Sequence, residues 1–366
     1  MVKFRMQATV GPASYIRQPD VLDNIGQHAQ MFGQKALVIG GKTALSITSE
    51  KMLKSLEESG IVSTTEWYGG ESSWTQINRL IQLVQAEKPQ LLIAVGGGKA
   101  IDTVKAVAYA TNLPVIAVPT IAATCAAATQ ISIIYNDEGI FTEISRLSKA
   151  PNLVLVDTTL ICQAPVRFLI AGIGDTLAKW FESRASSQKS VPTALVRTAV
   201  KIANELYLIL LESGKKAIES AQKGQASQAL NDVIDAIILI SGSVSGYGGD
   251  ACRTAAAHAI YSGLTIFPEV HDTYHGEIVA FGILSQLALE GKDVSEMKEL
   301  ISFYHQVQLP TTLKDMGIVS LSKEQLQQFG SVAVEIEDMA NMPFSVTPDM
   351  VINAVVQADR LGTEYK

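Results

Sequence analysis

Short apolar runs alternate with amphipathic stretches in the N-terminal part of the chain, and this alternation limits the possible folds more than any other feature. The apolar runs cover 35–41, 90–98, 113–120 and 152–157. They are rich in Val and Ile and bounded by Gly or Pro, which is typical of parallel strands buried on both faces. Residues 49–60 and 74–88 instead have helical periodicity, with Ile77, Leu80, Ile81 and Val84 on one face. The alternation predicts βαβ units and a mostly parallel α/β sheet.

The pattern becomes almost wholly helical from about residue 164 onward. Residues 196–213, 230–242 and 276–291 form long, apolar-rich stretches without strand punctuation. We therefore expect an α/β domain over 1–161 and an all-α domain over 162–366. No Pro- or Ser-rich linker and no internal repeat separates them, so we expect the two domains to pack closely, with cofactor and substrate in a cleft between them.

Composition excludes several classes of protein. The chain has 29 Lys and Arg against 36 Asp and Glu, a formal net charge of −7, which argues against a nucleic-acid binder. Charged residues make up only 18%, which favours a homo-oligomer with buried interfaces. No apolar run approaches the roughly 18 residues that a membrane span needs, and no secretory signal is visible. Cys125, Cys162 and Cys252 are far apart, as in a reduced cytoplasmic protein.

Three consecutive glycines end one of the apolar runs. Gly96, Gly97, Gly98 and Lys99 follow the expected strand directly and precede a helical stretch. Such a turn lets backbone N–H groups approach a phosphate, and the following helix adds its positive end. The turn matches neither of the common phosphate-loop motifs. The alternative is a tight βα turn that needs glycine for a positive φ.

Four strings of sequence together resemble one enzyme family. They are VGGGKAIDTVKAVA (95–108), VPTIAATCAAATQISIIYNDEG (118–139), GIGDTLAKWFE (172–182) and AAAHAIYSGLTIFPEVHDTYHGEIVAFG (255–282). They are similar, in this order, to the glycerol dehydrogenase branch of the metal-dependent (iron-type) alcohol dehydrogenases. The resemblance covers nearly the whole chain. It implies a Rossmann-like nucleotide-binding domain followed by a helical metal-binding domain.

The resemblance also implies a dinucleotide site. The pyrophosphate would lie at the three glycines, and the nicotinamide near Asp102. Four further positions match residues that line the family's dinucleotide pocket: Thr120, Thr129, Ile131 and Tyr135. Without the resemblance, Ile131 and Tyr135 would be interpreted as core strand residues.

Gly41 is a departure from the family pattern that bears on the choice of cofactor. NAD-using members carry an acidic residue after the first strand, where a carboxylate can hold the ribose hydroxyls. Here Gly41 stands at that place and Lys42 follows it. Losing the carboxylate removes repulsion against a 2′-phosphate, and a lysine can pair with it. We therefore expect NADPH to be preferred over NADH, the alternative being that Gly41 is a simple turn residue and NAD still binds.

The chain has five histidines, and three of them, His258, His271 and His275, lie within 18 residues of one another in the helical half. The resemblance assigns Asp175, His258 and His275 as protein ligands of one divalent metal ion. A carboxylate with two imidazoles suits Zn²⁺ or Fe²⁺ and leaves a position for a substrate oxygen. The alternative is a capping Asp with two structural histidines. His271 is interpreted as a rim residue without a catalytic role.

Lys179 lies one helical turn after Asp175, where classical iron-type members place a fourth ligand, a histidine. A protonated lysine cannot ligate a metal ion. It could form an i,i+4 ion pair with Asp175, it could reach the carboxylate of a substrate, or its charge could weaken metal binding. We favour the first two roles together.

Cys125 stands where glycerol dehydrogenases carry an aspartate that accepts hydrogen bonds from diol hydroxyls. We interpret Cys125 as a small residue that lines the pocket, not as a nucleophile. The combination of Cys125, Lys179 and the string GIGDTLAKW is similar to the hydroxycarboxylate dehydrogenase subgroup, which reduces 2-oxo acids. The sequence thus predicts a metal-dependent oxidoreductase that transfers a hydride between NAD(P)H and a small 2-oxo or 2-hydroxy acid.

Three other functions stay open. One is NAD-dependent oxidation of glycerol or another 1,2-diol. Another is a lyase of the dehydroquinate synthase type, for which Arg146, Arg167 and Arg253 could serve a phosphate leaving group, although no matching motif is present. The last is a non-catalytic dinucleotide binder whose metal site has decayed.

Overall fold

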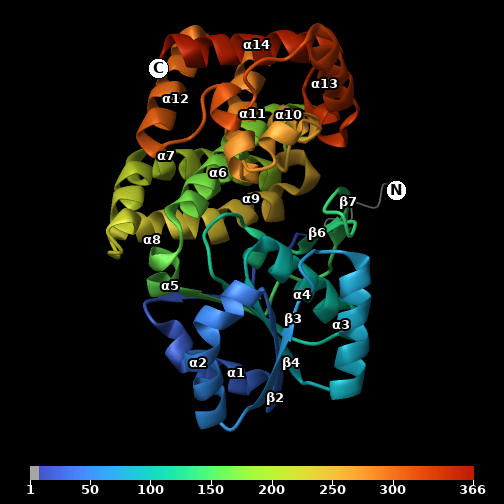
Figure 1. The fold of residues 1–366 in the computed structure, drawn as a ribbon, viewed down its shortest axis with the longest axis vertical. Coiled ribbons are helices and arrows are strands. Elements are labelled where there is room, and N and C mark those ends of the chain that lie inside the picture. The colour runs from blue at the N-terminus through green and yellow to red at the C-terminus, as the bar shows by residue number, and fades with distance from the viewer. Residues whose placement is uncertain (1–7) are drawn as a thin grey trace. The chain divides into compact units, whose positions relative to one another are not determined.

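The computed structural model describes residues 8–366 and divides the chain into two compact units (Figure 1). The first unit comprises Met1–Pro165 together with Ala221–Ala226, and the second comprises Val166–Ser220 and Ser227–Lys366. The boundary expected from the sequence, between 161 and 162, falls inside the short helix α5 (Thr158–Gln163).

A six-stranded parallel sheet forms the centre of the first unit, with the strand order β1-β8-β5-β4-β2-β3. Its central strands are buried except at Lys35, because each is a run of apolar residues with helices on both sides. These strands are β2 (Lys35–Gly40), β4 (Leu91–Gly96), β5 (Val115–Pro119) and β8 (Leu153–Asp157). The sequence therefore predicted all four central strands and the parallel α/β class correctly.

The two edge strands were not predicted from the sequence. They are β1 (Ser14–Gln18) and β3 (Val62–Trp67), which are polar and at best half-buried. Helices α1 (Ile25–Ala29) and α2 (Lys42–Glu58) cover one face of the sheet, and α3 (Trp74–Glu87) and α4 (Gly98–Thr111) cover the other (Figure 1). Met52 and Leu56 of α2 pack with Val38, Ile93 and Val118 in one apolar core.

An antiparallel hairpin of β6 (Ile131–Tyr135) and β7 (Phe141–Arg146) is fastened to α4 by a buried ion pair. Lys105 Nζ lies 2.8 Å from Asp102 Oδ1 and also donates to the carbonyl oxygens of Ala126 and Ile131. The second oxygen of Asp102 accepts from the Ile133 N–H at 3.1 Å. Burial raises the pKa of Asp102, and the charge of Lys105 opposes that shift.

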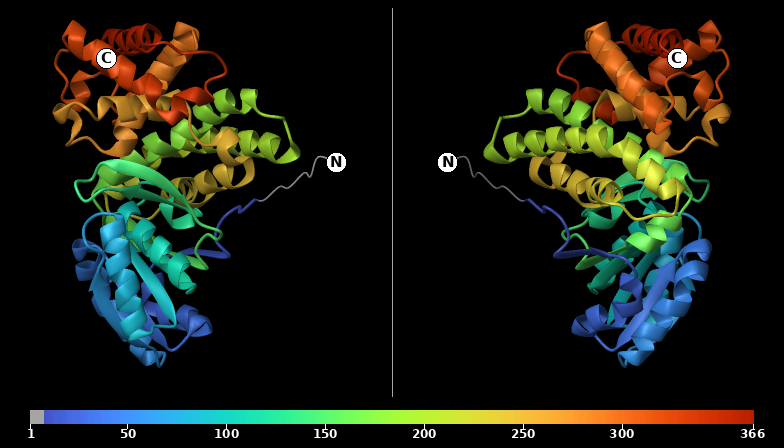
Figure 2. Two further views of the ribbon diagram at one scale, coloured as in Figure 1. Left: turned by 90° about the vertical axis from the view of Figure 1, so that its right-hand side faces the viewer. Right: turned by 90° about the vertical axis from the view of Figure 1, so that its left-hand side faces the viewer.

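The second unit, as far as the structure describes it, contains helices and no strand (Figure 1, Figure 2). Its centre is α11 (His275–Leu289), which is apolar on all sides and packs against α6 (Val166–Ser186), α10 (Ala256–Leu264) and α14 (Pro348–Glu364). The remaining long helices are α7 (Ala194–Gln222), α12 (Val294–Val307) and α13 (Lys323–Glu335). This confirms the expected all-α second part.

One helical run in the described part of the chain, Gln228–Cys252, is long and apolar enough to cross a membrane by composition alone. It joins α8 (Gln228–Asp235), a π-helical turn at Ala236–Ile240 and α9 (Ser241–Gly248). The sequence analysis expected no apolar run of this length. Its apolar window has a mean hydropathy of 1.3 and is 50% buried inside the protein.

Close approaches of the backbone fix α6, α10 and α11 against one another. A Cβ atom at Gly276, in the first turn of α11, would overlap the Ala171 carbonyl of α6, and one at Gly174 would overlap the Gly276 carbonyl. Farther along α11, a Cβ at Gly282 would overlap the carbonyl of Ala257 on α10. Only glycine permits contacts this close, so these positions set the spacing of the three helices.

Gly276→Ala is expected to lower the free energy of unfolding by about 1 to 3 kcal/mol, because α11 must move away from α6. An alanine inside a helix would otherwise stabilise it by about 1 kcal/mol. Urea denaturation measures the effect. Gly41→Ala is the control, since a Cβ at Gly41 would meet only the Tyr68 ring at 3.8 Å. Equal stability of the two variants would contradict this packing.

Candidate active site

Three potential metal ligands converge from three helices of the second unit. Asp175 comes from α6, His258 from α10, and His275 is the first residue of α11. Asp175 Oδ1 lies 3.2 Å from His275 Nε2 and 3.6 Å from His258 Nε2. The ligand atoms of all three lie within 4.8 Å of one another, and no other group of this kind occurs in the described residues. One carboxylate and two imidazoles at this spacing fit a divalent ion with an open position.

Glu182, two helical turns after Asp175 on α6, orients His258 from behind. Its Oε2 lies 2.7 Å from His258 Nδ1, and its Oε1 accepts from the backbone N–H groups of Ala255 (2.7 Å) and His258 (3.0 Å). Glu182 is fully buried. A carboxylate on Nδ1 fixes the imidazole so that Nε2 faces Asp175 and is available to a metal ion.

The charges in this cluster are strongly coupled. Burial alone would lower the pKa of His258, but the charge of Glu182 and the hydrogen bonds to Asp175 and Glu182 raise it to about 10. Burial opposes ionisation of Asp175, yet its hydrogen bonds to both histidines hold its pKa well below the usual range. Two buried carboxylates around two imidazoles therefore form a site for positive charge, carried by protons or by a metal ion.

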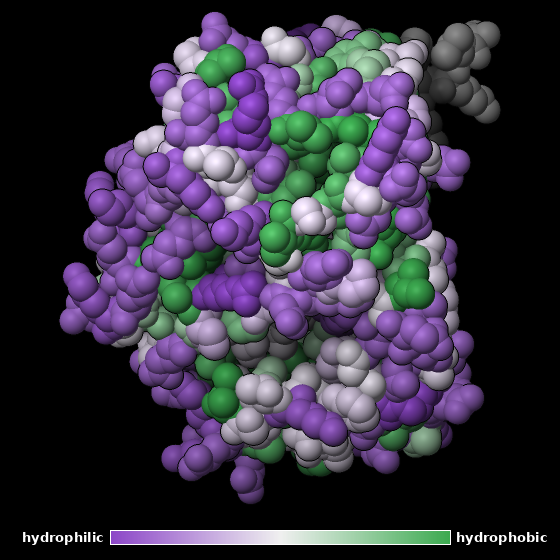
Figure 3. Space-filling model, turned by 45° about the horizontal axis from the view of Figure 1, so that its top comes forward, coloured by the Kyte–Doolittle hydropathy of each residue, from purple (hydrophilic) through white to green (hydrophobic). Residues whose placement is uncertain are grey.

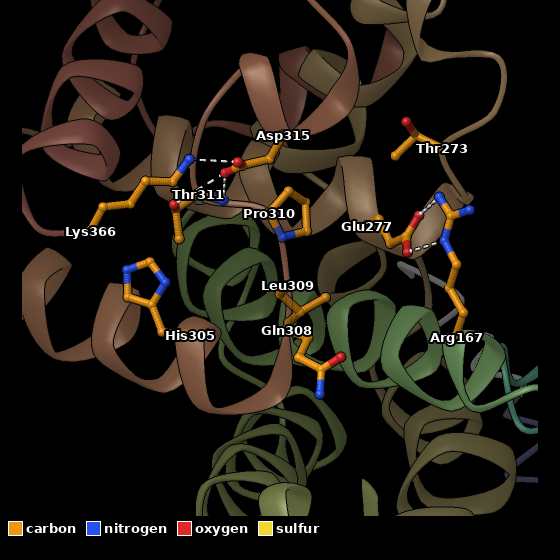
Figure 4. A pocket seen from close by; sticks show the side chains of 10 residues that line it. All are labelled: Arg167, Thr273, Glu277, His305, Gln308, Leu309, Pro310, Thr311, Asp315 and Lys366. Carbon is orange, nitrogen blue, oxygen red and sulfur yellow. Dashed lines mark hydrogen bonds and ion pairs between the residues drawn. The ribbon is translucent and has the colours of Figure 1, made fainter. Parts of the chain in front are cut away.

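The cap of α11 holds His275 in place. Glu277 Oε2 accepts a hydrogen bond from the Tyr274 N–H at 2.7 Å. The Arg167 guanidinium donates to both carboxylate oxygens of Glu277, at 2.7 and 2.8 Å (Figure 4). Arg167 and Glu277 line a cavity of about 380 Å³, whose wall also includes Asp315, paired with Lys366. On its other side, His275 meets the edge of the Tyr261 ring at 4.3 Å between centroids.

The structure does not form the expected ion pair between Lys179 and Asp175. Among the described residues no acidic group lies within 4.0 Å of Lys179 Nζ, although the helical spacing allows one. The side chain is buried and instead donates to the Arg253 carbonyl at 3.5 Å. His271 follows a 3₁₀ turn at Pro268–Val270, is exposed, and lies outside the ligand group.

The glycine turn in the first unit connects β4 to α4. Gly96 has a φ of +146°, which favours glycine, and Gly97 caps α4, which begins at Gly98. Thr120, after β5, donates its N–H to the Gly96 carbonyl at 3.1 Å, and Gly41 donates to Val95 at 3.2 Å. The structure thus gathers the predicted pyrophosphate glycines, Thr120 and Gly41 at one end of the sheet, the place where parallel sheets bind ligands.

The other predicted dinucleotide residues surround α4 and the hairpin. Lys99 Nζ pairs with Glu71 at 2.5 Å and lies 4.8 Å from the centre of the Tyr135 ring. Thr129 and Ile131 contact Lys105 through Oγ1 and the carbonyl oxygen, and Asp102 holds the hairpin as described above. Each keeps its assignment as a prediction.

The structure also places two residues on which the predicted specificity depends, Lys42 for the cofactor and Cys125 for the substrate. Lys42 Nζ lies 4.4 Å from the centre of the Trp67 ring, and Cys125 is half-buried just before a 3₁₀ turn at Ala126–Ala128. Sequence reasoning missed Glu182 altogether, and it named Arg253 only as a possible phosphate ligand. Glu182 could have been found from its spacing, seven residues after Asp175 on one helix face.

Comparisons with known proteins agree with this fold. The family model for iron-containing alcohol dehydrogenase matches residues 12–158. A glycerol dehydrogenase from Escherichia coli is 38% identical over 359 residues, and the match covers 97% of each chain. Hydroxycarboxylate dehydrogenase A from Escherichia coli is 35% identical, and the match covers 94% of this chain and 95% of that protein. The crystal structure of glycerol dehydrogenase from Schizosaccharomyces pombe has a TM-score of 0.91 at 32% identity, covering 99% of this chain and 92% of that one. The chain belongs to the iron-containing alcohol dehydrogenase family.

Glu182→Gln is expected to lower the affinity for Zn²⁺ about 10- to 100-fold, because an amide holds the His258 ring less firmly than a carboxylate. Competition with a chromophoric chelator measures the affinity. Glu212→Gln, on the exposed face of α7, is the matched control. An unchanged zinc affinity in Glu182→Gln would show that Glu182 does not orient a ligand.

Proposed function

We propose that the protein is a metal-dependent dehydrogenase that transfers a hydride between a nicotinamide cofactor and a small hydroxylated substrate. The convergence of Asp175, His258 and His275 carries the proposal. Glycerol or another 1,2-diol is the best-supported substrate, because several full-length relatives are named glycerol dehydrogenase. The sequence favoured a 2-oxo acid as the main substrate, and the names of these relatives favour the diol instead.

In this proposal Asp175, His258 and His275 hold one divalent ion, Zn²⁺ or Fe²⁺. A bound ion supplies a Lewis acid for a substrate oxygen, and a nicotinamide supplies or accepts the hydride. Glu182 keeps Nε2 of His258 directed at the site, and the Glu277–Arg167 pair keeps His275 at the start of α11. Burial and the charge of Asp175 raise the pKa of Tyr261, so that its phenol stays neutral and adds no negative charge beside the ligands.

The cofactor preference stays part of the proposal. Gly41 caps α2 beside the glycine turn and presents no carboxylate that would repel a 2′-phosphate. Lys42, the next residue, supplies a positive charge within the same turn of helix. We therefore propose NADPH over NADH, with NAD as the alternative.

A 2-oxo or 2-hydroxy acid is the second candidate substrate. One observation favours it: the ammonium group of Lys179 is buried without an acidic partner among the described residues. One relative is named hydroxycarboxylate dehydrogenase A, and this name agrees with such a substrate.

Activity and metal content together test the proposed function. The zinc-loaded protein is expected to oxidise glycerol or 1,2-propanediol with NAD⁺ or NADP⁺, and a chelator should abolish the reaction reversibly. Asp175→Asn should reduce both bound zinc and turnover by more than the 10- to 100-fold typical of an outer-shell residue. Turnover that survives complete removal of the metal would contradict the proposal.

We also propose that the protein acts as a homo-oligomer. Val191, Leu208 and Val319 expose 77%, 47% and 81% of their surface, and Figure 3 shows hydrophobic residues gathered between hydrophilic ones on the face that it draws. Light scattering during size-exclusion chromatography is expected to give a molar mass of at least twice the 39.2 kDa of one chain. A monomer at micromolar concentration would contradict this proposal.

A further inference from the structure

One face of α10 stays open although the rest of the helix is packed. Within Ala256–Leu264 the structure buries every residue except His258, Tyr261 and Ser262. Spacings of three and four residues place side chains on the same face of a helix. His258 is one of the three potential metal ligands, so the Tyr261 side chain leaves α10 on the face that carries a ligand.

The Tyr261 ring lies directly against the ligand group. Its centroid is 4.3 Å from that of the His275 imidazole, and the two ring planes are inclined at 79°. Burial raises the pKa of the Tyr261 phenol and the charge of Asp175 raises it further, so the hydroxyl keeps its proton. Tyr261 therefore borders the ligand group on the side of His275, whose side chain is 38% exposed and can be approached by a small molecule.

The hydrogen-bonding capacity of the Tyr261 hydroxyl is unused within the described part of the chain. The hydroxyl forms no hydrogen bond to another described residue. Buried phenols usually have a partner, as Tyr304 does, whose hydroxyl donates to the Ala280 carbonyl at 2.9 Å. A neutral phenol donates one hydrogen bond and accepts others. The Tyr261 hydroxyl is thus available to a molecule that binds at the ligand group.

The carboxylates behind the ligands are not available in this way. Glu182 uses its two oxygens on the ring and the backbone N–H of His258, and Arg167 donates to both oxygens of Glu277. Tyr261 differs because it contacts a ligand ring, is uncharged and has its polar atom free. A group that both donates and accepts matches an alcohol, which does the same, better than a carboxylate, which only accepts.

We propose that the Tyr261 hydroxyl binds the second hydroxyl group of a 1,2-diol whose first oxygen faces the three potential metal ligands. Tyr261 is then the residue that distinguishes vicinal diols from simple alcohols. The two oxygens of such a diol are separated by a single C–C bond, so they need partners that lie close together, as Tyr261 and His275 do. This inference rests on the proposed dehydrogenase function and names the group that selects the diol.

Tyr261 takes no part in the bond changes. Oxidation of the first alcohol removes a hydride from its carbon, which a nicotinamide accepts, and a proton from its oxygen, and it leaves a C=O double bond. The second hydroxyl keeps its proton throughout. Tyr261 therefore acts through binding and orientation, and its loss should raise KM for a diol more than it lowers kcat.

Tyr261→Phe tests the contact, because it removes only the hydroxyl and keeps the ring against His275. In the zinc-loaded, full-length protein we expect kcat/KM for 1,2-propanediol to fall about 10-fold, which corresponds to a neutral hydrogen bond of about 1.4 kcal/mol. For 1-propanol and 2-propanol, each of which lacks one of the two hydroxyls, kcat/KM should be lower than for the diol and unchanged by the substitution. Tyr109→Phe, the same chemical change at an exposed position of α4, is the control.

Two readouts do not depend on turnover. Calorimetry with the zinc-loaded protein should show that 1,2-propanediol binds about 10-fold more weakly to Tyr261→Phe than to the wild type. Competition with a chromophoric chelator should give the same zinc affinity for both proteins, because the ring contact with His275 remains. A lower zinc affinity in Tyr261→Phe would show that the hydroxyl supports the ligands instead of the substrate, and would overturn the inference.

The outcomes separate the two claims. Equal losses on the diol and on both simple alcohols, or no loss on the diol, would overturn the role of Tyr261 and leave the dehydrogenase function intact. No turnover of any of the three alcohols by the wild-type protein would overturn the proposed function, whereas weaker diol binding in Tyr261→Phe would still support the hydroxyl contact. Absence of both turnover and diol binding would overturn both.

Discussion

The site depends on how closely three helices of the second unit approach one another. Each ligand residue stands directly beside a residue at a point of backbone contact: Asp175 follows Gly174, His275 precedes Gly276, and His258 follows Ala257, which meets Gly282. A Cβ atom at any of these glycines would overlap a backbone carbonyl of the facing helix, so the helices would have to move apart and take the ligand atoms with them. The spacing of the three helices is thus set by backbone contacts, and Glu182 and Glu277 then orient the ligand side chains.

Buried charge is the second constraint on this unit. Glu182, Asp175 and His258 satisfy one another, and Arg167 with Glu277 fixes the start of α11. Lys179 and Arg253 stand apart because the described fold offers them too few acceptors.

The sequence predicted those parts of the fold that depend on local pattern. The four central strands have continuous apolar runs and were predicted within a few residues, whereas β1 and β3 lie at the sheet edges, where half-exposed polar side chains leave no such signal. The ligands Asp175, His258 and His275 lie on three separate segments, so only the family resemblance could bring them together. Spacing alone suggested an ion pair between Lys179 and Asp175, but the Lys179 side chain follows the segment before α10, whose path along α6 is set by tertiary contacts.

The most direct test of this account is a crystal structure of the zinc-loaded protein with anomalous scattering recorded at the zinc edge. The account predicts one strong anomalous peak per chain, bonded to Asp175 and to Nε2 of both His258 and His275, with the Glu182 carboxylate still on Nδ1 of His258. A peak bound elsewhere, or an ion that these three side chains do not share, would contradict it.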